Sequence, residues 1–262
     1  MIRIKTIHSE FALKPTIFPD GTSQVWKLPT EILNRKEYLI IWNFESEREI
    51  IDLYSLSLLL GYHVYIHLHI PYLPYGRQDK SVSNDTTFNL AVFADLINAL
   101  GFDKVTTVDA HNKQFFEKYI HNAVNLPVTG IHEKMIMNFL PTYIVFPDAG
   151  AVTRYNLSHL STIYCDKVRD QATGAILSHK VLSPPTLHAG KERLLIIDDI
   201  CDGGATFISV AKALREISPN MIIGLFVTHG IFSKGRQHLL DNGIDEIYTT
   251  DSLLKNTGDY EV

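Results

Sequence analysis

Short apolar segments alternate along this chain with longer segments in which apolar residues recur every three or four positions, and this alternation strongly constrains the fold. The short segments are predicted to be buried β-strands, at residues 38–42, 62–70, 105–108, 143–146, 161–164, 193–197, 221–227 and 246–249. The longer segments are predicted to be helices, at residues 47–60, 87–100, 133–140, 206–217 and around Leu239. Such alternation indicates an α/β fold with mostly parallel sheets.

The order of these segments is similar in the two halves of the chain, which join near residues 127–130. We therefore expect two domains, at residues 1–127 and 128–262, and the length of 262 residues is sufficient for both. Ligands of open α/β sheets bind beyond the carboxyl ends of the strands. The loops that follow the strands are consequently the places where functional residues are expected.

Charge and cysteine content exclude several classes of protein. The 24 Lys and Arg residues against 29 Asp and Glu residues give a formal net charge of −5, which provides no basic surface for nucleic acid. Two cysteines, Cys165 and Cys201, rule out a disulfide framework. The sequence has neither an apolar segment long enough to span a bilayer nor a recognisable signal peptide. A cytoplasmic protein without nucleic-acid or membrane partners is expected.

The strongest local signal is the segment 194–206, in which an apolar strand leads into three carboxylates, a pair of glycines and a helix. Glycines allow close backbone approach, and the N–H groups at the start of a helix bind phosphate. Carboxylates accept hydrogen bonds from sugar hydroxyls, so this segment is predicted to hold a sugar phosphate; a plain strand–turn–helix is the alternative. Thr206 is a candidate helix cap. The residues concerned are Asp198, Asp199, Asp202, Gly203, Gly204, Ala205 and Thr206.

Three further loops carry polar residues after predicted strands. The loop at 69–80 presents Arg77, whose planar guanidinium suits phosphate oxygens, and Gln78, which can pair with a base edge. His111 and Asp148 each follow a strand, and a carboxylate suits a hard cation such as Mg²⁺. Lys167 and Arg169 alternate after another strand, so they share a face in an extended segment. Solvated loop charges and a structural histidine are the alternative interpretations.

As an ordered set, these motifs resemble the ribose-phosphate pyrophosphokinase family of the phosphoribosyltransferase superfamily. Residues 194–206 resemble the phosphoribosyl diphosphate loop of the superfamily, and Pro-Tyr-x-Pro-Tyr-x-Arg-Gln-Asp at 71–79 resembles the ATP-binding segment of the family. Weaker matches are Phe-x-Asp-Gly at 18–21, Val-Asp-x-His at 108–111, Pro-Asp-x-Gly at 147–150 and Asp-Lys-x-Arg at 166–169. The resemblance runs from about residue 18 to about residue 251.

The resemblance implies two similar phosphoribosyltransferase-like domains, an N-terminal one for ATP and a C-terminal one for ribose 5-phosphate. It implies transfer of the β,γ-diphosphoryl group of Mg-ATP to the C1 hydroxyl of ribose 5-phosphate, giving phosphoribosyl diphosphate and AMP. Mg²⁺ is the implied cofactor, and a homo-oligomer built from dimers is the implied assembly. Two alternatives share parts of the pattern: a phosphoribosyltransferase that consumes phosphoribosyl diphosphate, and a non-catalytic regulatory relative.

The resemblance also implies a role for each site residue. His111 and Asp148 support the metal on the ATP phosphates, and Lys167 and Arg169 are the catalytic cations of a flap. Asp199 and Asp202 hold the ribose hydroxyls, and residues 203–206 hold the 5-phosphate. The residues expected to contact ATP are Arg77, Gln78, Asp79 and His111, together with Phe18 and Asp20 of a neighbouring subunit.

Four departures from the family pattern are present, and the last of them carries an expectation of its own. Thr22 stands where the family has Glu, and the turn after Asp202 reads Gly-Gly-Ala-Thr in place of Thr-Gly-Gly-Thr. The extra arginines common after Lys80 are missing. The family's C-terminal extension, which contributes to an allosteric site, does not follow the last predicted strand, so weak or absent ADP allostery is expected.

Overall fold

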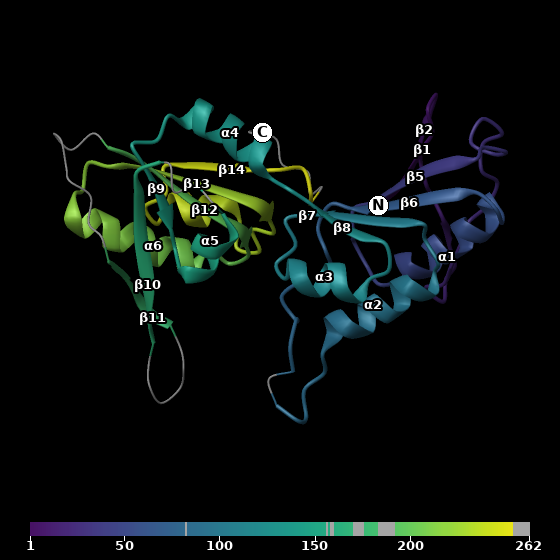
Figure 1. The fold of residues 1–262 in the computed structure, drawn as a ribbon, viewed down its shortest axis with the longest axis horizontal. Helices are drawn as coiled ribbons and strands as arrows, with labels where there is room; N and C mark the ends of the chain where they lie inside the picture. Colours follow the sequence, from purple (N-terminus) through teal and green to yellow (C-terminus); the bar gives the residue numbers. More distant parts are fainter. Residues whose placement is uncertain (82, 156, 158–159, 170–175, 183–191, 254–262) are drawn as a thin grey trace. The chain divides into compact units, whose positions relative to one another are not determined.

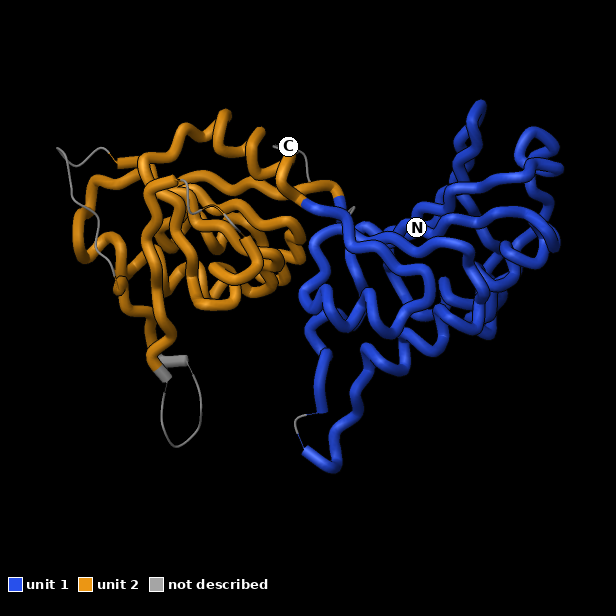
Figure 2. Tube along the Cα trace, in the orientation of Figure 1, with its two compact units in different colours: residues 1–127, 252–254 blue, residues 128–251, 255–262 orange. Residues whose placement is uncertain are grey.

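The structure is a computed structural model that describes residues 1–81, 83–155, 157, 160–169, 176–182 and 192–253 (Figure 1). For residues 169, 176 and 177 it describes the backbone only. The chain forms two compact units (Figure 2). Unit 1 comprises Met1–Pro127 and the segment that begins at Ser252, and unit 2 comprises Val128–Asp251.

Unit 1 is built on a six-stranded sheet of order β2-β1-β5-β6-β7-β8. Strands β5 to β8 run parallel, and β1 is antiparallel to both of its neighbours. A separate two-stranded hairpin, β3–β4, is also antiparallel. The strands are β1 (Ile2–Lys5), β2 (Glu10–Ala12), β3 (Thr16–Ile17), β4 (Ser23–Gln24), β5 (Glu37–Trp42), β6 (Tyr65–Ile70), β7 (Lys104–Val108) and β8 (Ala123–Leu126).

Three helices cover one face of this sheet (Figure 1): α1 (Glu49–Leu60), α2 (Asn89–Ala99) and α3 (Lys113–Tyr119). Leu53, Leu56 and Phe93 lie in one buried cluster with alternate residues of the strands, as the helical spacing of apolar residues requires. The sequence suggests Asp85, Thr86 or Thr87 as caps of α2, and this is wrong. The cap is Phe88, which makes no side-chain cap bond.

Unit 2 has a six-stranded sheet of order β11-β10-β9-β12-β13-β14, in which every pairing is parallel except that of β10 with β11. Beyond β9, strand β10 continues as an antiparallel hairpin with β11 that projects from the sheet (Figure 1). The strands are β9 (Tyr143–Phe146), β10 (Thr162–Arg169), β11 (Ile176–Val181), β12 (Arg193–Cys201), β13 (Ile222–Gly230) and β14 (Glu246–Thr249).

Helices cover both faces of this sheet, as a parallel sheet requires. Ile223 and Leu225 of β13 pack in one cluster with α6 (Ala205–Ile217). Between them, Gly224 faces the opposite way, and a Cβ atom placed there would lie 2.7 Å from the Phe139 ring of α4 (Thr129–Phe139). The two remaining helices are short: α5 (Ala149–Arg154) and α7 (Arg236–Leu240).

The alternation of strands and helices predicted from the sequence is confirmed, with differences at the ends of elements. Strand β12 continues to Cys201, so Asp198 and Asp199 lie inside the strand and not after it. Thr206 is not a helix cap, because the cap of α6 is Gly204 and Thr206 lies within the first turn. The sequence analysis did not identify β1 to β4, α3, β8, α5 or β11. Within the described residues, no helix combines the length and apolar character needed to cross a membrane.

Candidate functional site

Two loops that the sequence analysis singled out lie together in unit 1, after β6 and after β7. The side-chain amide of Asn112 donates to Asp79 Oδ2 at 2.9 Å. A Cβ atom at Gly76 would lie 3.8 Å from the Cβ atom of His111 and 3.1 Å from the carbonyl oxygen of Leu73. The structure therefore places His111 beside the loop that carries Arg77, Gln78 and Asp79, at the carboxyl ends of adjacent parallel strands.

The loop after β6 is held in shape by bonds to its own helix and core. The backbone N–H of Gln78 donates to the carbonyl of Tyr75 at 2.8 Å, and Asn89 of α2 donates to Gln78 Oε1 at 2.7 Å. Tyr75 has a left-handed backbone, with φ of 60°, its ring packs against Phe93, and its hydroxyl donates to Glu47. Arg77 and Gln78 lie exposed on this rigid support.

The turn of the β3–β4 hairpin carries Phe18 and Asp20, both exposed. The backbone N–H and the hydroxyl of Thr22 both donate to Asp20 Oδ1, at 3.0 and 2.7 Å, and the hydroxyl bond leads in lowering the pKa of Asp20. Within the chain, then, Asp20 acts as a turn residue whose carboxylate closes the hairpin. Ser23 of the same hairpin donates to Asp52 of α1 at 2.5 Å.

In unit 2, the carboxyl end of β12 leads through a glycine turn into α6. Gly204 has φ of +80°, and its carbonyl accepts the first helical hydrogen bond, from Ile208. Asp202 is exposed before this turn, and Asp199 is buried within the strand. The start of the 13-residue helix α6 therefore presents backbone N–H groups next to carboxylates, an arrangement suited to an anion that carries hydroxyl groups.

Asp148 and Lys167 meet beside this acidic segment. Asp148 caps α5 by accepting from the backbone N–H of Ala151 at 3.0 Å, and its second oxygen accepts a hydrogen bond from the ammonium group of Lys167. Lys167 lies in the β10–β11 hairpin, opposite His179. Arg169 ends β10, and its side chain lies outside the described part of the structure.

The carboxylates of unit 2 are close enough to interact electrostatically. The pKa of Asp198 is raised well above its ordinary value, first by burial and then by the negative charge of Asp199, with a smaller contribution from the charge of Asp148. The backbone N–H of Asp199 also donates to Asp198 Oδ1 at 2.9 Å. Asp148, Lys167, Asp198 and Asp199 thus form one cluster in unit 2, whereas His111 belongs to unit 1.

Arg154 is a fifth member of this cluster, and the sequence analysis missed it. It ends α5, and its guanidinium Nη1 lies 2.6 Å from Asp199 Oδ2, with only 5% of the Asp199 side chain exposed. The sequence shows Arg154 as a basic residue soon after Asp148, but the six-residue helix that it ends was not predicted. Nothing in the local pattern identifies its partner, which lies 45 residues further along the chain.

The metal-binding side chains of the site suit a metal ion that enters bound to a substrate better than one that the protein holds by itself. Across the described residues, no group of three or more His, Cys, Asp and Glu side chains is arranged to enclose a metal ion. Mg²⁺ is ordinarily held by one or two carboxylates together with substrate phosphates and water. Asp148 is a carboxylate of this kind, and its two oxygens accept from Ala151 and Lys167.

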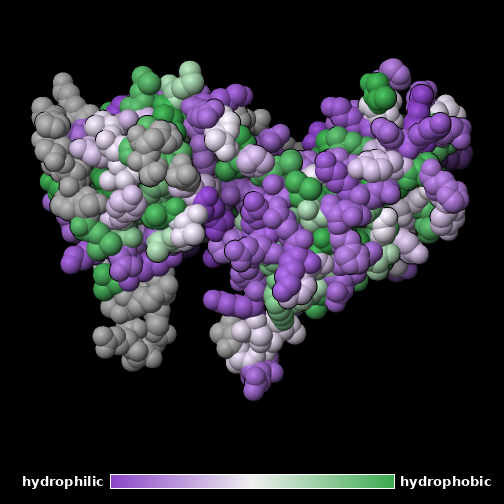
Figure 3. Space-filling view, viewed as in Figure 1, coloured by the Kyte–Doolittle hydropathy of each residue, from purple (hydrophilic) through white to green (hydrophobic). Residues whose placement is uncertain are grey.

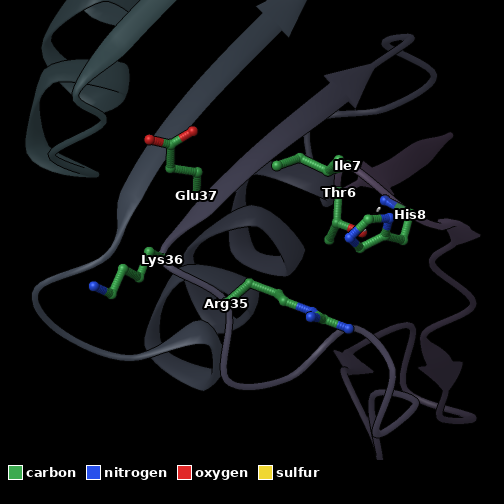
Figure 4. A pocket seen from close by; sticks show the side chains of 6 residues that line it. All are labelled: Thr6, Ile7, His8, Arg35, Lys36 and Glu37. Atoms are coloured by element: carbon green, nitrogen blue, oxygen red, sulfur yellow. Dashed lines mark hydrogen bonds between the residues drawn. The ribbon is translucent and has the colours of Figure 1, made fainter.

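A shallow pocket of about 250 Å³ lies elsewhere in unit 1, near the amino end of β5, and is lined by Thr6, Ile7, His8, Arg35, Lys36 and Glu37 (Figure 4). The side chains of Arg35 and Lys36 point in different directions there, so its charges do not converge on a ligand. Hydrophilic residues cover much of the molecular face shown in Figure 3, with hydrophobic residues scattered among them.

Comparisons with known proteins agree with the resemblance seen in the motifs, although no protein-family model matches the chain. The chain is 32% identical to a ribose-phosphate pyrophosphokinase of Shewanella oneidensis over 195 residues, which are 70% of this chain and 59% of that protein. It is 33% identical to that of Maricaulis maris over 194 residues, covering 71% and 61% of the two chains. The chain thus spans about three fifths of the length of these relatives.

Two further matches extend over most of the chain. A ribose-phosphate pyrophosphokinase of Sulfurisphaera tokodaii is 24% identical over 251 residues, covering 90% of this chain and 83% of that protein. The crystal structure of phosphoribosylpyrophosphate synthetase from Mycobacterium smegmatis superposes with a TM-score of 0.74 at 20% identity, covering 96% of this chain and 83% of that one. The predicted α/β fold class, with two mostly parallel sheets flanked by helices, is confirmed.

Proposed function

Because the chain is a relative of the ribose-phosphate pyrophosphokinases, we propose that it transfers the β,γ-diphosphoryl group of ATP to the C1 hydroxyl of ribose 5-phosphate. The C1 oxygen forms a bond to the β-phosphorus, the bond between that phosphorus and the α,β-bridging oxygen breaks, and AMP leaves. The hydroxyl proton passes to solvent. The observation that carries the proposal is the ion pair of Lys167 with Asp148 beside Asp198 and Asp199, since it holds an ammonium group next to the acidic segment, where it can neutralise phosphoryl charge.

In this proposal each unit binds one substrate. Unit 1 binds ATP through Arg77, Gln78 and Asp79, and the bond from Asn89 to Gln78 Oε1 supports a fixed orientation of that side chain. Unit 2 binds ribose 5-phosphate, with its phosphate at the turn of Gly203 and Gly204 and its hydroxyls on Asp199 and Asp202. Phosphoryl transfer needs little covalent chemistry from the protein, so positioning and charge neutralisation supply the catalysis.

Mg²⁺ is the proposed cofactor, held by the ATP phosphates together with His111 and Asp148. When bound, it neutralises negative charge on the phosphate oxygens. Lys167 and Arg169 are proposed to stabilise the charge that develops on the β-phosphate. In the ion pair described above, the Lys167 ammonium is held by Asp148, and in this proposal it exchanges that carboxylate for a phosphate oxygen.

We propose further that the protein acts in the cytoplasm as a homo-oligomer built from dimers, in which a neighbouring subunit supplies Phe18 and Asp20 to the adenine. The exposure of Phe18 on its hairpin supports this assignment. A variant Phe18→Ala should raise the KM for ATP and leave the KM for ribose 5-phosphate unchanged.

The decisive experiment is to incubate the protein with MgCl₂, ATP and ribose 5-phosphate and to follow the nucleotides by ³¹P NMR. We expect AMP and phosphoribosyl diphosphate to accumulate in equal amounts. Formation of ADP would instead identify an ordinary kinase. Consumption of phosphoribosyl diphosphate in the presence of a nucleobase, without AMP formation from ATP, would identify a phosphoribosyltransferase. Absence of any turnover, with ligand binding retained, would indicate a regulatory relative.

A matched pair of variants tests the role of the β10–β11 hairpin. Lys167→Met should reduce turnover by about 10²–10³-fold, the usual loss for a preorganised charge donor. Lys180→Met is the control, because Lys180 is exposed in the same hairpin and lies opposite Asp166 in the strand register, whereas Lys167 lies opposite His179. Near-normal turnover of Lys167→Met, or equal losses in the two variants, would remove Lys167 from the mechanism.

A further inference from the structure

We propose that Arg154 is a positioning residue for ribose 5-phosphate, which it affects through Asp199 and without contacting the sugar. This inference rests on the proposed function, in which Asp199 accepts hydrogen bonds from the ribose hydroxyls. The observations that carry it are the close ion pair of Arg154 with Asp199, the burial of that pair, and the position of Arg154 on α5.

The ion pair fixes the direction of the Asp199 carboxylate. Its oxygen Oδ2 lies 2.6 Å from the guanidinium Nη1, and the backbone N–H of the same residue donates to Asp198 Oδ1 at 2.9 Å. A carboxylate held in this way by a guanidinium cannot rotate freely about its Cβ–Cγ bond, because charge-assisted hydrogen bonds of this length are strong. Hydroxyl groups that approach Asp199 would therefore meet oxygens in a set orientation, which lowers the entropic cost of binding.

Because the Asp199 carboxylate is buried, it needs the guanidinium of Arg154 to compensate its charge. The side chain of Asp199 is 5% exposed and that of Arg154 is 19% exposed, so solvent screens the pair weakly. A buried carboxylate that neighbours another carboxylate is costly unless a cation compensates it. Without Arg154, Asp199 would turn towards solvent or towards other donors, and its orientation for the sugar would be lost.

The helix α5 places Arg154 and Asp148 in relation to each other. It contacts β9, β10 and β12, it starts at the cap Asp148, which binds Lys167, and it ends at Arg154, which binds Asp199. One short helix thus fixes both ion pairs of the cluster. Because Arg154 pairs with the sugar-side acid, its loss should affect binding of ribose 5-phosphate and not that of ATP.

The test compares Arg154→Met with Arg154→Lys and with a matched control, Arg215→Met. Arg215 also forms an Arg–Asp ion pair in unit 2, with its Nη2 2.8 Å from Asp245 Oδ2, and it additionally donates to the carbonyl of Gly243. We expect Arg154→Met to raise the KM for ribose 5-phosphate about 10- to 100-fold, with the KM for ATP changed less than about twofold. Arg154→Lys should raise the KM for ribose 5-phosphate about 3- to 10-fold, since an ammonium keeps the charge of a guanidinium but not its planar fork. Arg215→Met should change neither KM.

Calorimetric binding of ribose 5-phosphate in the absence of ATP separates this inference from the proposed function. If the wild-type protein binds the sugar and Arg154→Met binds it at least tenfold more weakly, the inference holds even where no AMP is formed. If AMP is formed and Arg154→Met keeps the wild-type KM for ribose 5-phosphate, the inference is overturned and the proposed function stands. Equal effects of Arg154→Met and Arg215→Met, or no binding by the wild-type protein, also overturn it. Should Arg154→Met fail to fold, an unchanged KM in Arg154→Lys would refute the inference.

Discussion

Replacement of Gly204 by alanine should destabilise unit 2, whereas the same replacement at Gly203 should not. Gly204 has φ of +80°, and a Cβ atom there would lie 2.5 Å from Cδ2 of Leu239 and 3.2 Å from its Cγ. At Gly203 the nearest atom to a new Cβ is Lys234 Cε, at an ordinary contact distance of 3.6 Å. The two glycines are adjacent and chemically identical, so each variant controls for the other.

Two free-energy costs add in Gly204→Ala. An L-residue in the left-handed region costs about 1–2 kcal/mol, and forcing a methyl group into a packed site costs about 1–3 kcal/mol. Leu239 is 1% exposed, so it cannot move into solvent to relieve the contact. The entropy that alanine removes from the unfolded chain is the same in both variants and cancels. Gly204→Ala should thus be about 2–5 kcal/mol less stable than Gly203→Ala.

Native-state hydrogen exchange of the β12 and β13 amides measures this difference inside unit 2. At about 1.4 kcal/mol per factor of ten, the protection of these amides should be lower in Gly204→Ala by about 30- to 4,000-fold. Both tryptophans, Trp26 and Trp42, lie in unit 1, so their fluorescence during denaturation provides an internal reference that should not change. Equal protection of β12 and β13 in the two variants would refute the reasoning.

Three further predictions concern titratable groups. Burial raises the pKa of Cys165 and Cys201 to about 12, so neither should react with a thiol reagent at pH 8 until the protein unfolds; rapid labelling of the native protein would contradict this. Burial, with the charges of Lys104 and His69, lowers the pKa of His67 to about 4 from its ordinary 6.5. The unfolded chain therefore binds this proton more readily, and unit 1 should lose stability as the pH falls from about 6.5 to about 4, a slope that should be absent from the urea midpoints of His67→Gln. Burial is the largest single influence on the pKa of Asp148 and raises it, but the hydrogen bond and charge of Lys167, together with backbone hydrogen bonds from Ala151 and Gly150, outweigh burial and lower the pKa below 3.8. The resulting stability is present above that pH and lost below it, so the difference in stability between wild type and Lys167→Met should shrink below about pH 4.

Much of the fold could be predicted because its signals are local. The central strands and long helices bury continuous or periodic apolar residues, and the structure contains all of those predicted. The elements that were missed are short or lie at the sheet edges: α5 has six residues, and β3 and β4 have two each. Segments of this length carry too few periods to be distinguished from loops. The predicted cap of α2 was wrong, because the helix is capped by Phe88, which makes no side-chain hydrogen bond to it.

The sequence by itself determined which loops carry functional residue types, because each loop follows a strand that its own apolar run specifies. It identified Asp198, Asp199 and Lys167 as candidates in one half, and the resemblance to known sequences implied their roles, although the structure places all three inside β12 and β10 and not after strands. Only the tertiary structure decided which of them meet. The sheet order places β9 between β10 and β12, so Asp148 of the β9 loop reaches Lys167, 19 residues away in the chain, and Arg154 reaches Asp199 across 45 residues. Strand order depends on packing between distant segments, and the local pattern of a chain does not record it.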